Sequence, residues 1–280
     1  MLTKVTTSIV PSPDLLSLEF LISMPAASNQ AFDVITYFVS NFPKLADAGI
    51  SGYPLILNSL PWLTPGTTTF TTIKGMIGNL IMINHKNPAD MNALLDPIYK
   101  KINETWPGLA TITPTITYYP NFYAWFNDHY DKSPVGHENL VSSRLLDAEA
   151  LSGNATKTRA ALEKFSAGGQ ATVFIVSGKG VHNAKPRGGG NSVLPAWRNV
   201  YVHASAFFGS RGFPFLRKTW LTLCSYRRSM AATKSGVSSP GPPGVRILGV
   251  RPARAGAEHG RLHERGSNPP AHRTAGSQQE

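Results

Sequence analysis

The sequence predicts an α+β fold in which an antiparallel β-sheet carries helices on one face, followed by a disordered tail. Short segments that alternate apolar and polar residues, a pattern typical of strands, recur through residues 1–210 of the 280-residue chain. Three segments with apolar residues at helical spacing interrupt them. The resulting order is strand, strand, helix, strand, strand, helix, strand, helix, strand, strand. This mixed order is typical of α+β domains, in which helices bury one apolar face against a sheet.

The strand predictions rest on alternation and on turn residues at the ends of each segment. Leu2–Val10 alternates Thr, Val and Ile and stops at Pro11. Leu15–Met24 is an amphipathic strand, with large apolar residues on one face and Ser17 and Glu19 on the other. The later strands are expected at Gly52–Asn58, Ile73–Asn84, Thr111–Tyr119 and Gln170–Ser177.

The helix predictions rest on apolar spacing and on residues that favour helix starts. Ser28 or Asn29 caps the first helix, and Asn87 or Asp90 opens the second. The third helix is expected at Thr156–Phe165, and two glycines close it.

Proline and glycine mark the expected breaks. Pro43 ends the first helix, and Leu60–Thr72, which is rich in Pro and Thr, is expected to be a loop. Gly75 and Gly78 indicate bulges or close backbone approaches within a strand. The glycine-rich segments within residues 178–190 lack the spacing of phosphate-binding loops, so we interpret them as flexible turns.

The densest group of aromatic residues lies between Tyr118 and Tyr130. Aromatic side chains at this density can line a pocket for a planar substrate, and the candidate pocket residues are Tyr118, Tyr123 and Trp125. The alternative is an aromatic mini-core beneath a long loop. Lys and Arg do not alternate with these rings, which disfavours a base-stacking surface for nucleic acid. His137, in a polar loop, is interpreted as solvated rather than as a general base.

A second notable stretch is Asn191–His203, which is expected to be a short extended segment, a buried Trp-Arg pair and then a strand. Trp197 brings a large apolar face with one N–H that needs a partner. Arg198 is a planar, permanently charged group suited to a carboxylate or to a row of carbonyls. On the residues alone, this pair is a structural corner in which the Trp fills a core and the Arg holds a loop.

The composition excludes several classes of protein. The single cysteine, Cys224, excludes an internal disulfide framework and a Cys-rich metal site, so no metal is expected. No apolar run is long enough to span a bilayer, the N-terminus lacks the order of a signal peptide, and the location in the cell stays unassigned.

The formal net charge of +11 is concentrated in the tail. Residues 211–280 carry 12 Lys and Arg against 3 Asp and Glu, whereas residues 1–210 carry 15 against 13. The tail is dominated by Arg, Gly, Pro, Ser and Ala without hydrophobic periodicity, so it is expected to be disordered. Its abrupt change of composition is typical of a frameshift or a misread intron, and a tail that binds nucleic acid is the alternative.

Three segments resemble one family of flavoproteins. NSVLPAWR (Asn191–Arg198) is similar to the N-S-x-x-P-A-W-R signature of FAD-linked oxidoreductases, the berberine-bridge-enzyme-like group of the vanillyl-alcohol-oxidase superfamily. Leu194 stands where the family usually has Asn. Val135–Leu151 resembles the family's G-x-x-x-x-x-S-R-L-L segment, and MLTKVTTSIVPSPDL (Met1–Leu15) resembles the last strand of its FAD domain. Fungal members of secondary metabolism, including the chanoclavine synthases of ergot alkaloid biosynthesis, are the members it resembles most.

The resemblance implies a domain organisation. Residues 1–14 would be a remnant of the FAD-binding domain, residues 15–209 the substrate-binding α+β domain, and residues 210–280 the basic tail. The flavin-attaching residues of the family would precede Met1, and its closing C-terminal motif has no match, so the chain is expected to be a truncated form that is inactive alone.

The resemblance also implies a function, namely oxidation of a planar small molecule, such as an alkaloid precursor, with hydride transfer to FAD. It adds Asn191 to the candidate pocket residues and assigns no catalytic or cofactor-binding residue. Neither a membrane nor a nucleic acid is expected as a partner. The alternative function is a non-catalytic binding module with a basic nucleic-acid-binding tail.

Overall fold

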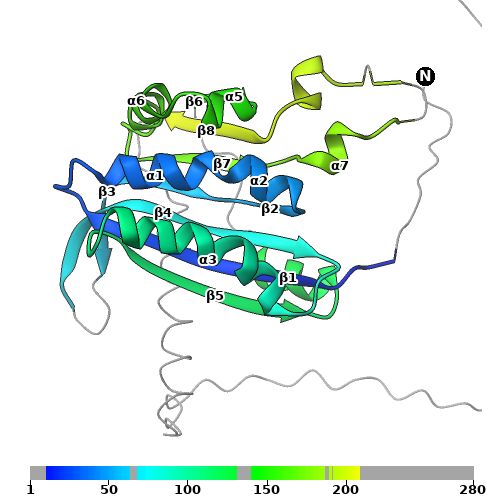
Figure 1. Cartoon of the computed structure of the whole chain (residues 1–280), viewed down its shortest axis with the longest axis horizontal. Helices are drawn as coiled ribbons and strands as arrows, with labels where there is room; N and C mark the ends of the chain where they lie inside the picture. Colours follow the sequence, from blue (N-terminus) through cyan, green and yellow to red (C-terminus); the bar gives the residue numbers. More distant parts are fainter. Residues whose placement is uncertain (1–10, 64–67, 131–139, 187–188, 191, 209–280) are drawn as a thin grey trace, which may run out of the picture. The chain divides into compact units, whose positions relative to one another are not determined.

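In the computed structural model, which describes residues 11–63, 68–130, 140–186, 189–190 and 192–208, eight strands form one sheet (Figure 1). The strands are β1 (Leu15–Pro25), β2 (Ile50–Gly52), β3 (Leu55–Leu63), β4 (Phe70–Ile83), β5 (Thr111–Tyr119), β6 (Leu140–Leu146), β7 (Gln170–Ile175) and β8 (Val202–Phe208). The helices are α1 (Ala31–Ser40), α2 (Phe42–Asp47), α3 (Pro88–Thr105), α4 (Phe122–His129), α5 (Ala148–Ser152), α6 (Ala155–Phe165), α7 (Lys179–His182) and the 3-10 helix η1 (Pro195–Arg198). The strands pair antiparallel throughout, which confirms the predicted fold class.

The sheet has the strand order β5-β1-β4-β2-β7-β8-β6, and β3 shares the position of β2 between β4 and β7. A break at Tyr53 and Pro54 separates β2 from β3. The ladder nevertheless continues across the break, because the Tyr53 N–H donates to the Asn79 carbonyl (2.8 Å) and the Val173 N–H donates to the Pro54 carbonyl (2.9 Å). A Cβ on Gly78 would overlap the backbone of Pro54, so glycine is needed where these strands meet.

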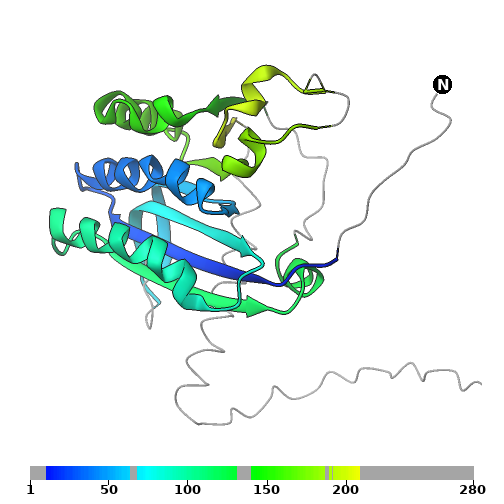
Figure 2. The ribbon, with the colours of Figure 1, turned by 45° about the vertical axis from the view of Figure 1, so that its right-hand side comes forward.

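The main hydrophobic core lies between one face of the sheet and helices α1, α2, α3, α5 and α6. The even-numbered residues of β1 all point into it and are at most 3% exposed: Leu16, Leu18, Phe20, Ile22 and Met24. The helices pack against them with apolar residues at helical spacing, such as Phe32, Ile35 and Val39 of α1 and Met91, Leu95, Ile98 and Ile102 of α3. Figure 2 shows α1, α3 and α6 along the same side of the sheet. Each such side chain stabilises the fold by about 1.5–3 kcal/mol through burial.

The opposite face of the sheet, which we term the open face, carries two small clusters. The first joins Leu15 and Ile81 to Trp125 of α4, so α4 is an exception to the prediction that helices cover one face only. The second cluster joins Leu21, Leu57 and Ile73, with Leu60 and Trp62 packed against it. Strand β1 is therefore buried on both faces, and Ser17, expected on a polar face, is only 1% exposed.

Several boundaries differ from the sequence predictions. Gln30, rather than Ser28 or Asn29, precedes the first turn of α1, and Ser28 accepts a hydrogen bond from the Gln30 N–H instead. Pro43 does not end α1 but lies in the first turn of α2, where its missing N–H costs nothing. Of the two predicted starts of α3, the structure has Asn87 as the cap, and its side chain accepts from the Ala89 N–H at 3.1 Å.

Two predicted irregular segments are ordered elements. Most of Leu60–Thr72 belongs to strands β3 and β4, which pair Pro61 with Thr72 and Trp62 with Thr71. The turn expected around residues 178–180 contains the short helix α7. The expected strand Leu2–Val10 and the tail from residue 210 lie outside the described residues, as do Asn191 and His137.

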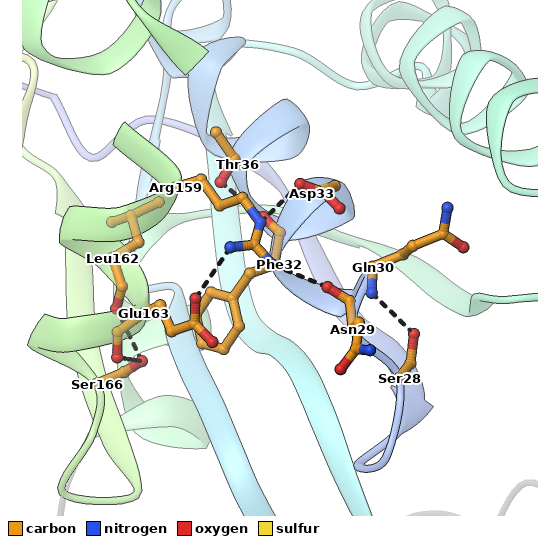
Figure 3. Close-up of polar contacts among 10 residues, drawn as sticks. All are labelled: Ser28, Asn29, Gln30, Phe32, Asp33, Thr36, Arg159, Leu162, Glu163 and Ser166. Carbon is orange, nitrogen blue, oxygen red and sulfur yellow. Dashed lines mark hydrogen bonds and ion pairs between the residues drawn. The ribbon is translucent and has the colours of Figure 1, made fainter. Parts of the chain in front are cut away.

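Arg159 of α6 ties this helix to the start of α1 (Figure 3). Its guanidinium lies 2.7 Å from Asp33 and 3.0 Å from Glu163, and it donates to the Asn29 carbonyl at 2.8 Å. One planar group thus contacts an acidic side chain on each helix and the turn that precedes α1. None of the described helices is both long and apolar enough to cross a membrane.

Candidate functional site

A row of side chains crosses the open face from β1 to β8. Glu19 of β1 lies opposite Asn79 of β4, whose carbonyl pairs with the Tyr53 N–H. The Tyr53 ring meets the Phe174 ring edge-on with centroids 5.1 Å apart, and Phe174 of β7 lies opposite His203 of β8. A carboxylate, an amide and three rings are therefore neighbours on one face, although they are far apart in sequence.

The β1 end of this row is held by α4. The Trp125 indole N–H donates to the Ser17 hydroxyl at 3.1 Å, and the Asn79 amide N–H donates to the same oxygen at 2.7 Å. Trp125 is 7% exposed. The Asn79 side-chain oxygen is buried, and none of the described residues donates to it, so it is an acceptor that can take one more hydrogen bond.

His129, also on α4, completes this end of the row. Its Nδ1 lies 2.9 Å from the Trp125 carbonyl and its Nε2 lies 3.4 Å from Glu19. Because both neighbours are acceptors, the protonated ring satisfies both contacts. Burial lowers the pKa of His129, but the hydrogen bonds to Glu19 and to the Trp125 carbonyl, with the charges of Glu19 and Asp128, outweigh it and raise the pKa overall. The pair can thus hold a proton at the edge of the open face.

The other end of the row is aromatic. The His203 ring lies 5.4 Å from the Trp197 ring, and Trp197 is half-buried rather than buried as expected. Arg198 donates to the Gly190 carbonyl at 3.1 Å, and its buried Nε has no partner among the residues that the structure describes. Trp197 therefore extends the aromatic surface, while Arg198 contacts the preceding loop.

Buried polar side chains continue along β7 and β8. Gln170, Thr172 and Ser205 are each 5% exposed, and they share the open face because Val173 and Ile175 point into the main core. The Thr172 hydroxyl donates to the Ser205 carbonyl at 3.2 Å. Within the described part of the chain, neither amide atom of Gln170 has a hydrogen-bond partner. Native proteins rarely leave such groups unpaired, so Gln170 marks a polar position with capacity to bind.

The predicted pocket residues are not brought together. On β5, Tyr118 points to the same face as Ile112 and Ile116, which pack against the main core. Its hydroxyl lies 3.5 Å from Asp14. Tyr123 is 69% exposed on α4. Trp125 alone lies on the open face. These three side chains point in different directions, because Tyr118 lies on the core face of β5, whereas Tyr123 and Trp125 lie on α4, exposed and buried respectively.

A serine and a histidine outside this row approach each other without forming a catalytic pair. Ser177 Oγ lies 3.5 Å from His182 Nε2, but both side chains also contact the Val200 carbonyl. Since a carbonyl only accepts, His182 Nε2 carries the hydrogen and cannot remove a proton from Ser177. The arrangement ties the residues at both ends of α7 to the Val200 carbonyl.

Sequence reasoning missed Glu19, Asn79, Gln170 and Phe174 as site residues. The available signal was the polar residue inside an otherwise apolar strand, since Ser17, Glu19 and Asn79 all interrupt apolar segments. Polar residues at such positions are either solvated or functional, and the pairing register decides which residues meet.

Neither a family model nor a curated protein sequence matches this chain. Among solved structures, the VAO-type flavoprotein MtVAO713 from Myceliophthora thermophila C1 matches 75% of the chain at 22% identity with a TM-score of 0.60. A second VAO-type flavoprotein, MtVAO615, matches 69% at 15% identity with a TM-score of 0.49. The chain spans 37% of the length of MtVAO713. The described domain therefore has the fold of part of a VAO-type flavoprotein.

Proposed function

We propose that this chain supplies the substrate-binding portion of an FAD-linked oxidoreductase, with the open face of the sheet turned toward the flavin. The observation that supports this most is the combination of the shared fold with a polar and aromatic row on the sheet face opposite the main core. An antiparallel sheet commonly turns one polar face to water, so the proposal depends on this row together with the shared fold. The face presents Glu19, Asn79, Tyr53 and Phe174.

The side chains of the open face fit a flavin ring. An isoalloxazine is planar and has carbonyl oxygens and an N–H at one edge, so it needs donors, acceptors and apolar surface in one plane. The open face offers the unpaired amide of Gln170 and the unpaired oxygen of Asn79, together with the apolar cluster of Leu21, Leu57 and Ile73. We therefore propose that these residues contact the flavin or the substrate that lies against it.

The chemistry is divided between cofactor and protein. FAD, when bound, takes a hydride from the substrate. The residues of this chain would bind and orient the substrate, with Tyr53 and Phe174 as stacking surfaces for a planar ring. Glu19, paired with His129 at 3.4 Å, would accept the proton that leaves the substrate.

We further propose that the substrate is a planar small molecule of secondary metabolism, such as an alkaloid precursor, and that the protein is of the berberine-bridge-enzyme-like type. The motif NSVLPAWR and the aromatic character of the open face support this finer proposal. The aromatic contact surface is assigned to Tyr53, Phe174 and Trp197. Trp125 is assigned a supporting role near Glu19, where its indole N–H donates to Ser17 of the same strand.

A chimera tests the proposed function. The segment of MtVAO713 that matches this chain is replaced by residues 11–208, and the purified protein is examined for bound flavin by its visible absorbance. We expect flavin to be retained and a Glu19→Gln version to bind flavin equally while losing turnover of planar amine substrates. A chimera with native-like circular dichroism and no flavin would contradict the proposal. The parent MtVAO713 serves as the control.

A further inference from the structure

The Gln170 side chain is the most unusual polar group on the open face. The residue is 5% exposed, and both its amide nitrogen and its amide oxygen are buried without a hydrogen-bond partner. A primary amide can donate two hydrogen bonds and accept two. Leaving such a group unpaired in the interior is costly, so a partner is expected that the described protein groups do not supply.

The polar neighbours of Gln170 are already occupied. Leu57, which lies opposite Gln170 in the adjacent strand, is apolar. The Asn58 amide donates to the Ser166 carbonyl at 3.3 Å, and the Thr172 hydroxyl donates to the Ser205 carbonyl at 3.2 Å. Neither these side chains nor Leu57 therefore pairs with the Gln170 amide, whose donor and acceptor both remain unused among the described residues.

The position of Gln170 also limits the shape of that molecule. Gln170, Thr172 and Phe174 follow one another on the same face of β7, and four residues of a strand span about 13 Å. Exposure increases along this line, since Phe174 is half-buried and the adjoining Tyr53 is 53% exposed. A flat, elongated ring system can lie along β7, with its apolar end against Phe174 and its polar edge at Gln170.

We propose that Gln170 is the polar end of a binding site along β7 for a planar ring that carries adjacent N–H and C=O groups, as lactams and cyclic imides do. An amide side chain matches such an edge with two parallel hydrogen bonds in one plane. The isoalloxazine of a flavin and a lactam-containing substrate share this chemistry. If the bound ring is the flavin, this site is part of the proposed function and depends on it. If the ring is a lactam, the site stands independently of that proposal.

Two probes separate the sources of this chemistry. Lumichrome is a tricyclic flavin analogue with an imide edge and no sugar, and quinolin-2-one is a lactam without the flavin ring. Each is titrated into the full-length chain labelled with nitrogen-15, and the side-chain amide resonance of Gln170 is followed. We expect this resonance to shift with at least one probe. Probes methylated on the ring nitrogen should bind about tenfold more weakly, because one hydrogen bond is lost and a methyl group is inserted.

The variant Gln170→Leu keeps the size of the side chain and removes its hydrogen bonds. We expect it to lose at least tenfold in affinity for the probe and to unfold at the same or a higher temperature without ligand, because the unpaired amide is gone. The matched control is Gln30→Leu, which changes an exposed glutamine whose side chain makes no capping bond. It should leave probe affinity unchanged.

Two results would overturn the inference. Unchanged affinity in Gln170→Leu would mean that the ring does not contact this amide. A lower unfolding temperature of ligand-free Gln170→Leu would mean that bound water or the protein itself already pairs with the amide. Binding of quinolin-2-one but not of lumichrome would support the Gln170 site and assign it to the substrate. A chimera that binds no flavin would contradict the proposed function, but it would not contradict a lactam-binding site at Gln170.

Discussion

At the scale of single residues, His129 of α4 is placed against the open face of the sheet so that its protonated ring has two acceptors. Its ring contacts the Trp125 carbonyl through one nitrogen and Glu19 through the other, and it stacks on the Trp125 ring with centroids 5.0 Å apart. The facing titratable groups are Glu19 on β1, Asp128 on its own helix and Tyr119 on β5, whose ring lies 5.7 Å away. The arrangement favours the charged ring.

We therefore predict that the pKa of His129 lies above the ordinary value of 6.5 and falls in Glu19→Gln. A raised folded-state pKa stabilises the fold below the unfolded-state pKa, and this stabilisation is lost as the pH rises through the folded-state pKa. Proton NMR titration of the ring measures the pKa, and His85, whose partner Asp90 is exposed, is the internal reference. A pKa that does not respond to Glu19→Gln would contradict the ion pair.

A glycine inside β4 makes a second prediction at this scale. A Cβ on Gly75 would overlap the Ile22 carbonyl of the neighbouring strand, so Gly75→Ala must push β1 and β4 apart. We expect a loss of about 1–3 kcal/mol in the free energy of unfolding, the range typical of overpacking. Gly180→Ala is the matched control, because nothing lies within 4 Å of its Cβ position. Equal urea midpoints for the two variants would show that β1 and β4 are not in close contact at Gly75.

At the scale of elements, Arg159 connects two helices that share the main core. Arg159→Ala removes its contacts with Asp33, Glu163 and the Asn29 carbonyl at once. We expect a loss of about 1 kcal/mol, because the group is partly exposed and screened by solvent. Arg144→Ala is the control, since that exposed side chain donates to the carbonyl of its neighbour Ser143. Urea unfolding of both variants measures the difference, and equal losses would argue against a tie between α1 and α6.

The elements also show what the sequence could predict. Strand β5 was predicted to the residue, because Thr and Ile alternate between two clear breaks. The α3 start was predicted as Asn87 or Asp90, and Asn87 is the residue that caps the helix with its own side chain. The α1 start was not, because no side chain caps it. The pairing of Leu60–Leu63 with Phe70–Ile73 was missed because cross-strand pairing outweighed a composition rich in Pro and Thr.

The candidate site was harder to predict than the fold. Local density of aromatic residues favoured Tyr118, Tyr123 and Trp125, but the pleat of β5 and the turn of α4 send them in different directions. The row on the open face joins Glu19 to Asn79 and Phe174 to His203 through strand register. Register between distant segments depends on the whole sheet, so local periodicity does not reveal it.

At the scale of the whole molecule, the distribution of charge separates the described domain from the tail. Of the net charge of +11, residues 211–280 hold 12 basic against 3 acidic residues, while residues 1–210 are nearly balanced. Attraction to any polyanion should therefore come from the tail, without sequence preference, and weaken steeply with salt. The body, which carries the open face, should contribute little to it.

We predict that the full chain elutes from heparin at a higher salt concentration than a variant ending at residue 210, and that the two have the same thermal unfolding midpoint. The higher elution salt is expected because residues 211–280 carry 12 basic against 3 acidic residues. The second follows because the main core, as far as the described residues form it, lies between Leu16 and Ala204. Retention that survives removal of residues 211–280 would assign nucleic-acid binding to the body and favour a binding module over an oxidoreductase. A lower midpoint would instead show that the tail packs on the domain.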